Sequence, residues 1–204
     1  MIENLLPFLT ASVLLTLSPG PDIIYVLVQS LSNGIRAGIL TTLGLVSGII
    51  IHTALVAFGV SGILKESETI YLIIRIFGAC YLFFLAYRVW TSEAEIHFQP
   101  KTGLKIGDLS LFKRGFIMNV LNPKVTIFFL AFFPGFIWDT TDNYVFQFFI
   151  LGVIFMIQAF IIFGIVALLA GKIAAYLGRH SGTGVVFKLL QIFVFVGIGL
   201  FILF

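Results

Sequence analysis

Ser18-Pro19-Gly20-Pro21-Asp22 and Asn122-Pro123-Lys124 are two short polar breaks inside otherwise apolar stretches of this chain, and Asn119 lies one helical turn before the second break. Proline removes a backbone donor and bends a helix. The breaks also carry opposite charges, at Asp22 and at Lys124. Broken, charged helices persist in a bilayer only where protein or a water-filled cavity surrounds them. The two breaks are therefore typical of a transporter that holds a polar substrate near the bilayer midplane.

The composition indicates a membrane protein. The 204 residues are 60% hydrophobic and only 10% charged, whereas a soluble domain carries about 25% charged residues. The length suits a single transmembrane domain over residues 1–204. The net charge of +3 is small, and we expect no nucleic-acid partner. The N-terminus lacks the basic region of a signal peptide, so we expect the first segment to be retained.

Six segments are long and apolar enough to span a bilayer, which requires about 20 mostly apolar residues. They are roughly 5–31, 38–63, 69–90, 115–137, 145–171 and 185–204. The predicted fold class is an all-α membrane protein with six transmembrane helices, of which the first and the fourth are broken. The polar stretch 91–113 joins two three-segment halves, about 1–90 and 115–204.

An odd number of segments in each half implies that a duplicated half would be inverted in the membrane. The sequence holds faint evidence for such a 3+3 repeat. Leu5–Thr10 resembles Leu121–Thr126, and at nearly the same offset Pro19-Gly20 meets Pro134-Gly135. This register does not pair the two charged breaks with each other, and it stays open.

Lysine and arginine predict the orientation, because cytoplasmic loops are rich in both. Nine of the twelve fall near connections on one side: Arg36, Arg88, Lys101, Lys105, Lys113, Arg114, Lys172, Arg179 and Lys188. Only Lys65 falls on the other side. We therefore expect a cytoplasmic loop 91–113 and an external C-terminus. Segment one either crosses the membrane or turns back at Pro19-Gly20-Pro21 as a re-entrant hairpin, and we favour crossing.

Both intramembrane charges are deep. Asp22 lies 14 residues from Arg36, about 21 Å along a helix, and Lys124 lies ten residues beyond Arg114, about 15 Å. One interpretation is a salt bridge that only ties segments one and four together. We favour a substrate site, because buried ion pairs rarely repay their desolvation. Lys124 and free helix N-termini would then face a carboxylate, and Asp22 a cation or proton.

These motifs carry a family resemblance. Ser-Pro-Gly-Pro-Asp at 18–22, Leu-Asn-Pro-Lys at 121–124 and Phe-Phe-Leu-Ala-Phe-Phe-Pro at 128–134 resemble the LysE/RhtB family of bacterial amino-acid exporters. The length, the six apolar segments and the basic central loop are similar too. The resemblance implies a multi-pass protein of the bacterial inner (cell) membrane that exports a small amino acid or derivative, by antiport with protons. It does not identify the amino acid.

Three further polar residues lie within segments. His52 follows Gly44 and Gly48, whose spacing lets another helix approach closely; His52 either relays protons or only ties helices together. Gln158 either ties helices together or contacts substrate. Arg75 is expected to extend its side chain to the outer interface.

Enzyme hypotheses fit poorly. Gly59-Val60-Ser61-Gly62 resembles an intramembrane serine protease motif, but His180 falls on the opposite side, and an aspartyl protease needs a second deep aspartate beside Asp22. No histidine–cysteine cluster has metal-ligand spacing, since His52, His97 and His180 are scattered. We expect no enzyme, cofactor or bound metal. Export of a metal cation or another small polar metabolite, and a non-transporting membrane subunit, stay open as alternatives.

The predicted site consists of substrate- or proton-binding residues and of residues that open the helices. The first group is Asp22, Lys124, Asn122, Asn119, His52 and Gln158, and the second is Pro19, Gly20, Pro21 and Pro123. The expected partners are an amino-acid substrate, protons and the lipid bilayer. The sequence leaves homo-oligomerisation open.

Overall fold

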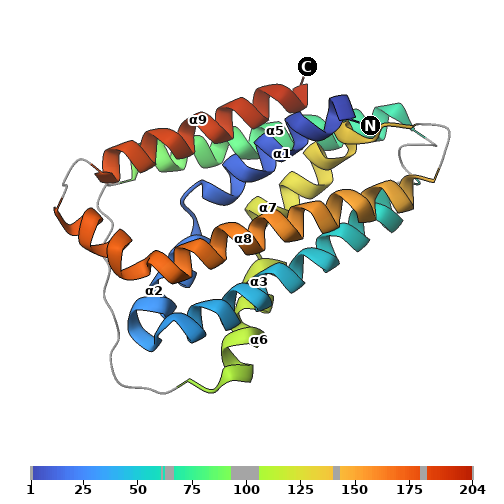
Figure 1. The fold of residues 1–204 in the computed structure, drawn as a ribbon. Helices are drawn as coiled ribbons and strands as arrows, with labels where there is room; N and C mark the ends of the chain where they lie inside the picture. Colours follow the sequence, from blue (N-terminus) through green and yellow to red (C-terminus); the bar gives the residue numbers. More distant parts are fainter. Residues whose placement is uncertain are drawn as a thin grey trace.

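A computed structural model gives the structure of residues 2–60, 62, 67–92, 106–139, 143–179 and 183–203 (Figure 1). Regular structure in these residues is entirely helical. The elements are α1 (Ile2–Leu17), α2 (Pro21–Asn33), α3 (Ile35–Leu55), the π-helix η1 (Val56–Val60), α5 (Glu68–Thr91), α6 (Asp108–Val120), α7 (Pro123–Ile127), the π-helix η2 (Phe128–Phe132), the 3₁₀-helix η3 (Phe133–Phe136), α8 (Tyr144–Arg179) and α9 (Thr183–Leu203).

The predicted six spans are confirmed. Four are continuous helices: Ile35–Val60, Glu68–Thr91, Tyr144–Leu177 and Gly184–Leu203. The other two are bent pairs, Leu5–Leu17 with Pro21–Asn33 at 54° and Asp108–Val120 with Pro123–Phe136 at 48°. A re-entrant hairpin would need the chain to reverse, and neither bend approaches that. Both termini lie at the same end of the bundle, as six crossings require (Figure 1).

Proline chemistry produces both bends. Pro21 is the first residue of α2, where its missing N–H costs nothing and its fixed φ suits a helix start. Pro123 begins α7 in the same way. The breaks therefore lie near the middle of spans one and four, at corresponding points of the two halves. The inverted repeat stays a prediction, but these positions differ from the register that the Leu5–Thr10 similarity indicates.

Several predicted segments were shorter than the helices in the structure. Segment five was expected to end at 171, but α8 continues to Arg179, so Lys172 and Arg179 belong to the helix. Segment four begins at Asp108 instead of 115. Arg36 lies in the first turn of α3 and forms an ion pair with Asp108 at 2.5 Å. Long cationic side chains reach water from a helix end, so a helix can continue through Lys172 without placing its charge in the bilayer core. Residues 93–105 of the predicted central loop lie outside the described residues.

Helices α3 and α6 meet backbone to backbone. A Cβ at Gly44 would overlap the Phe112 carbonyl, and one at Gly115 would overlap the Thr41 carbonyl. A Cβ at Gly48 would lie 2.7 Å from Asn119 Oδ1. The close approach predicted from Gly44 and Gly48 is therefore confirmed, and it fixes how deep α6 carries Asn119.

An aromatic cluster fills the bundle beyond the second break. Phe128 and Phe129 are 0% and 1% exposed, and Phe129 stacks on Phe133 at 4.2 Å between ring centres. Phe128 also contacts Phe155 of α8, at 5.6 Å. The helix changes from α to π to 3₁₀ form along this segment. π-helical turns are rare and frequently occur at functional sites.

Candidate functional site

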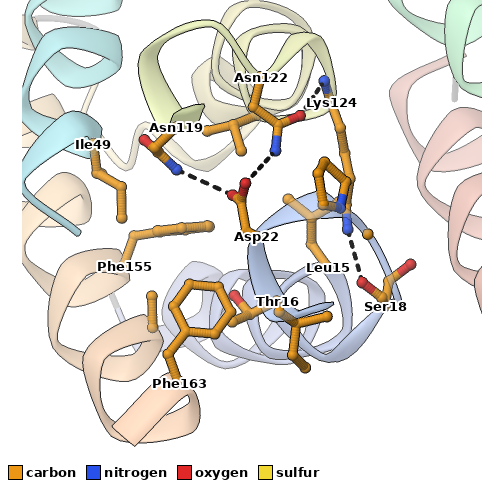
Figure 2. A pocket seen from close by; sticks show the side chains of 15 residues that line it. Leu15, Thr16, Ser18, Asp22, Ile49, Asn119, Asn122, Lys124, Phe155 and Phe163 are labelled. Atoms are coloured by element: carbon orange, nitrogen blue, oxygen red, sulfur yellow. Dashed lines mark hydrogen bonds between the residues drawn. The ribbon is translucent and has the colours of Figure 1, made fainter. Parts of the chain in front are cut away.

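Asp22 lies at the point where the two helix breaks face each other (Figure 2). It occupies the first turn of α2 and is 8% exposed. Asn122 Nδ2 donates a hydrogen bond to Asp22 Oδ1 at 2.9 Å, and Asn119 Nδ2 donates one to Oδ2 at 3.3 Å. The positive end of a helix dipole stabilises a carboxylate in this position. Three of the predicted site residues are thus held in one cluster.

Asn122 does two tasks with one amide group. While its Nδ2 binds Asp22, its Oδ1 accepts a hydrogen bond at 3.0 Å from the backbone N–H of Lys124, which caps the start of α7. Asparagine is among the preferred N-cap residues. The geometry of the second break and the position of the Asp22 carboxylate are therefore coupled through a single side chain.

Lys124 does not pair with Asp22. Its Nζ donates to the Ser18 backbone carbonyl at 3.0 Å and lies 5.7 Å from the centre of the Phe195 ring of α9. The only ion pair within 4 Å among the described residues joins Arg36 to Asp108. The alternative of a direct salt bridge between spans one and four is therefore wrong for this conformation. The ammonium instead satisfies a carbonyl that the break after α1 leaves without a helical partner.

A small cavity lies between the two charged groups. Its volume is about 30 Å³, and its wall includes Asp22, Lys124, Asn119 and Asn122. Gly20 also lines it, and a Cβ there would lie 3.4 Å from Lys124 Nζ. One water needs about 10–15 Å³ by this measure, whereas ligand pockets measure about 300–1,000 Å³. The conformation is therefore closed, with room for water but not for an amino acid.

His52 and Gln158 do not line this cavity. His52 Nε2 donates to the Asn119 backbone carbonyl at 3.0 Å, so the Nε2 nitrogen carries the proton, and the buried Nδ1 has no partner among the described residues. Gln158 Nε2 donates to Thr16 Oγ1 at 3.0 Å. His52 therefore ties α3 to the end of α6, and Gln158 ties α8 to α1. Each residue connects a neighbouring span to the site.

The glycine and the prolines predicted to open the helices lie at the breaks between α1 and α2 and between α6 and α7. Gly20 and Pro21 line the cavity, whereas Pro19 lines an apolar groove beside α8. Sequence reasoning missed two polar members of the wall, Thr16 and Ser18. The Ser18 hydroxyl is buried and has no partner in the part of the chain that the structure describes. The position of both residues within three residues of Pro19 was an available signal. It also missed Phe155 and Phe163, which close the cavity from α8 and carry no distinguishing local pattern.

Comparison with known proteins decides the family. Residues 13–204 match the family described as LysE type translocator. The chain belongs to the LysE type translocator family. The predicted resemblance is confirmed, and this LysE-type chain is a translocator and not an enzyme. Together with its apolar spans, membership of this family makes it a multi-pass protein of the bacterial inner membrane.

Three relatives illustrate the similarity. A homoserine/homoserine lactone efflux protein of Salmonella typhimurium is 32% identical over 170 residues, which cover 83% of this chain and 82% of the relative. A leucine efflux protein of the same organism is 28% identical over 180 residues, covering 88% and 85%. An uncharacterized membrane protein of Vibrio cholerae is 31% identical over 176 residues, covering 86% and 82%. No solved structure matches this chain.

Proposed function

We propose that this LysE-type protein exports a small amino acid or derivative and couples export to proton entry. The observation that carries the proposal is the buried Asp22 carboxylate, which two amides hold across from the Lys124 ammonium in a closed cavity between two broken helices. Ionisable groups inside a membrane are costly and are kept for transport or proton transfer. The leucine and homoserine efflux relatives support export as the direction.

Asp22 is the proposed acceptor for a proton or for the substrate amine. Its two oxygens receive hydrogen bonds from Asn122 and Asn119, so the anion is stabilised without a direct ion pair among the described residues. Either a proton or an ammonium could neutralise it. Competition between the two for one carboxylate is a simple way to couple their opposite movements.

Lys124 is the proposed partner for the substrate carboxylate. In the closed conformation its ammonium is occupied by the Ser18 carbonyl. An incoming carboxylate would form a bond in which donor and acceptor are both charged, which is stronger than the present bond from the ammonium to a neutral carbonyl. Binding would therefore draw Lys124 away from the end of α1 and loosen the contact between the two breaks. The cavity of about 30 Å³ must expand in this step.

A panel of radiolabelled amino acids tests the function directly. Inverted membrane vesicles are energised with a proton gradient, and accumulation is measured for leucine, homoserine, threonine, lysine and arginine. We expect accumulation of at least one that collapses when an uncoupler removes the gradient. Vesicles without the protein are the control. If none of these amino acids, nor other small polar metabolites added to the panel, accumulates above the control, the export proposal fails.

Asp22→Asn tests the coupling. The variant keeps the size of the side chain but cannot ionise. We expect proton-driven efflux to be lost. Exchange of internal for external substrate continues only if Asp22 carries the proton and does not bind the substrate amine. Normal efflux driven by the pH gradient would move the proton carrier elsewhere, with His52 next because its Nδ1 is free to accept a proton.

The double variant Asp22→Asn with Lys124→Met separates a substrate site from a structural tie. If the two charges only support each other electrostatically, removing both leaves neither buried alone, and efflux recovers. If they bind substrate and proton, the protein folds but does not transport. Size-exclusion behaviour and thermal unfolding of the purified variant provide the folding control. Recovery of wild-type efflux would contradict the proposed site.

A further inference from the structure

A second, larger cavity lies at the end of the bundle where the chain termini lie. Its volume is about 660 Å³, and it is formed by the first turns of α5, the last turn of α9 and the η2–η3 segment. This is the end that the lysine and arginine distribution predicts to be external. Apart from Arg75, its wall is apolar or aromatic: Tyr71, Phe132, Pro134, Gly135, Tyr144 and Phe201 contribute to it.

Arg75 is the charged residue of this cavity. Its Nε donates to the Ile202 carbonyl in the last turn of α9 at 2.5 Å, and the expected reach of its side chain to the outer interface stays a prediction. The guanidinium lies 5.9 Å from the centre of the Tyr71 ring. No described carboxylate pairs with it. Its two terminal nitrogens, with four N–H donors, therefore have no protein partner among the described residues.

One helical segment connects this cavity to the inner one. Val125 lines the inner cavity, and Phe132 lines the outer cavity. They are seven residues apart, about 10 Å along a helix. Phe128 lies between them along the chain and is 0% exposed. A substrate that followed this segment from Lys124 to Arg75 would have to pass the Phe128 ring.

We propose that the outer cavity is an exit subsite that binds the carboxylate of the departing substrate through Arg75. This inference rests on the proposed export function and adds a second binding position to it. Arginine suits a carboxylate because its planar guanidinium donates two parallel hydrogen bonds. The Nε bond to Ile202 holds the group in the cavity wall and leaves its two terminal nitrogens available to a ligand.

The remaining wall is apolar or aromatic and suits an apolar side chain of a small amino acid. The volume is within the usual range for ligand pockets, in contrast to the closed inner cavity. Gly78, one turn beyond Arg75 on α5, packs directly on Ala131, where a Cβ would overlap the alanine side chain. This contact fixes α5, and therefore Arg75, against the segment that links the two cavities.

A reporter cysteine at Gly135 tests the anion preference without any need for transport. A Cβ at Gly135 meets no atom within 4 Å, so Gly135→Cys fits. The native Cys80 is exposed and is first changed to alanine. Gly62→Cys, in the short connection before α5, is the matched control because a Cβ there is also unobstructed. The purified variants are placed in phosphatidylcholine vesicles and modified with an anionic and a cationic methanethiosulfonate of similar size.

We expect the ratio of anionic to cationic reaction rates to be about tenfold higher at Gly135→Cys than at Gly62→Cys. One unit charge several ångströms away in water changes the local concentration of each ion about threefold, in opposite directions. Arg75→Lys should keep most of this preference, and Arg75→Gln, which still offers a donor to Ile202, should abolish it. Equal ratios at the two cysteines would overturn the proposal.

Ligand protection identifies the anion. We expect the amino acid found by the transport panel, or leucine if the panel finds none, to slow modification of Gly135→Cys, whereas its amide, which lacks the carboxylate, should not. Arg75→Gln should remove the difference in protection between the amino acid and its amide. If Arg75 had only a structural role, Arg75→Gln would weaken protection by both ligands alike. If phosphatidylglycerol in the vesicle protects the cysteine and the free amino acid does not, Arg75 binds a lipid headgroup and the exit subsite is wrong. Protection without transport would contradict the export function alone.

Discussion

Asn122→Ser is the substitution that best separates the two tasks of Asn122. Serine keeps an oxygen that can cap α7, but its short side chain does not reach Asp22, which the asparagine amide contacts at 2.9 Å. A hydrogen bond to a charged group contributes about 1.5–3 kcal/mol. At 1.4 kcal/mol for each factor of ten, we expect the rate of proton-driven efflux to fall by about 10- to 100-fold.

Asn122→Ala removes the cap as well, which lowers the free energy of unfolding by about a further 0.5–2 kcal/mol. The alanine variant should therefore unfold at a lower temperature than the serine variant, while both lose efflux to a similar extent. Thr126→Val is the control, because it removes only the hydroxyl bond from Thr126 to the Asn122 carbonyl at 3.1 Å and leaves Asp22 untouched. It should transport at close to the wild-type rate.

The assay is energised efflux in inverted vesicles, normalised to the amount of folded protein, with thermal unfolding of each purified variant in detergent. If Asn122→Ser transports as fast as Thr126→Val, the bond to Asp22 has no role in coupling. If instead the serine variant is as unstable as the alanine variant, the cap and the carboxylate contact are not separable, and the two-task account of Asn122 is refuted.

Three further predictions follow from the charges and the packing. Lys124→Ala should abolish export with expression retained, as measured by radiolabelled efflux beside an immunoblot; normal export would exclude Lys124 from substrate binding. A cysteine at Lys101, which lies outside the described residues, should resist membrane-impermeant thiol reagents added to whole cells, and rapid labelling would reverse the predicted orientation. Gly44→Ala should lower the thermal unfolding temperature strongly, because its methyl group meets the Phe112 backbone and overpacking costs about 1–3 kcal/mol; Gly59→Ala, which has open space, should not.

The sequence by itself determined the features that depend on local chemistry. Apolar length defines a span whatever surrounds it, so six crossings could be predicted. Proline bends a helix by its own geometry, so both breaks could be placed at Pro19–Pro21 and at Pro123. The depth of Asp22 and Lys124 followed from helix rise. Helix ends were less predictable, since charged residues such as Lys172 continue a helix while reaching water.

Tertiary structure decided which groups meet across the bundle. The opposite charges of Asp22 and Lys124 would favour an ion pair if charge alone decided. Instead, Asp22 accepts hydrogen bonds from two amide side chains, and Lys124 donates to the Ser18 carbonyl. The rotation and the depth of each helix in the bundle decide which groups come together. The glycine contacts between α3 and α6 set where Asn119 lies, and the Asn122 cap sets how α7 starts. The contacts of Asn119 with His52 and of Asn122 with Asp22 join residues about 70 and 100 positions apart, and no local pattern records them.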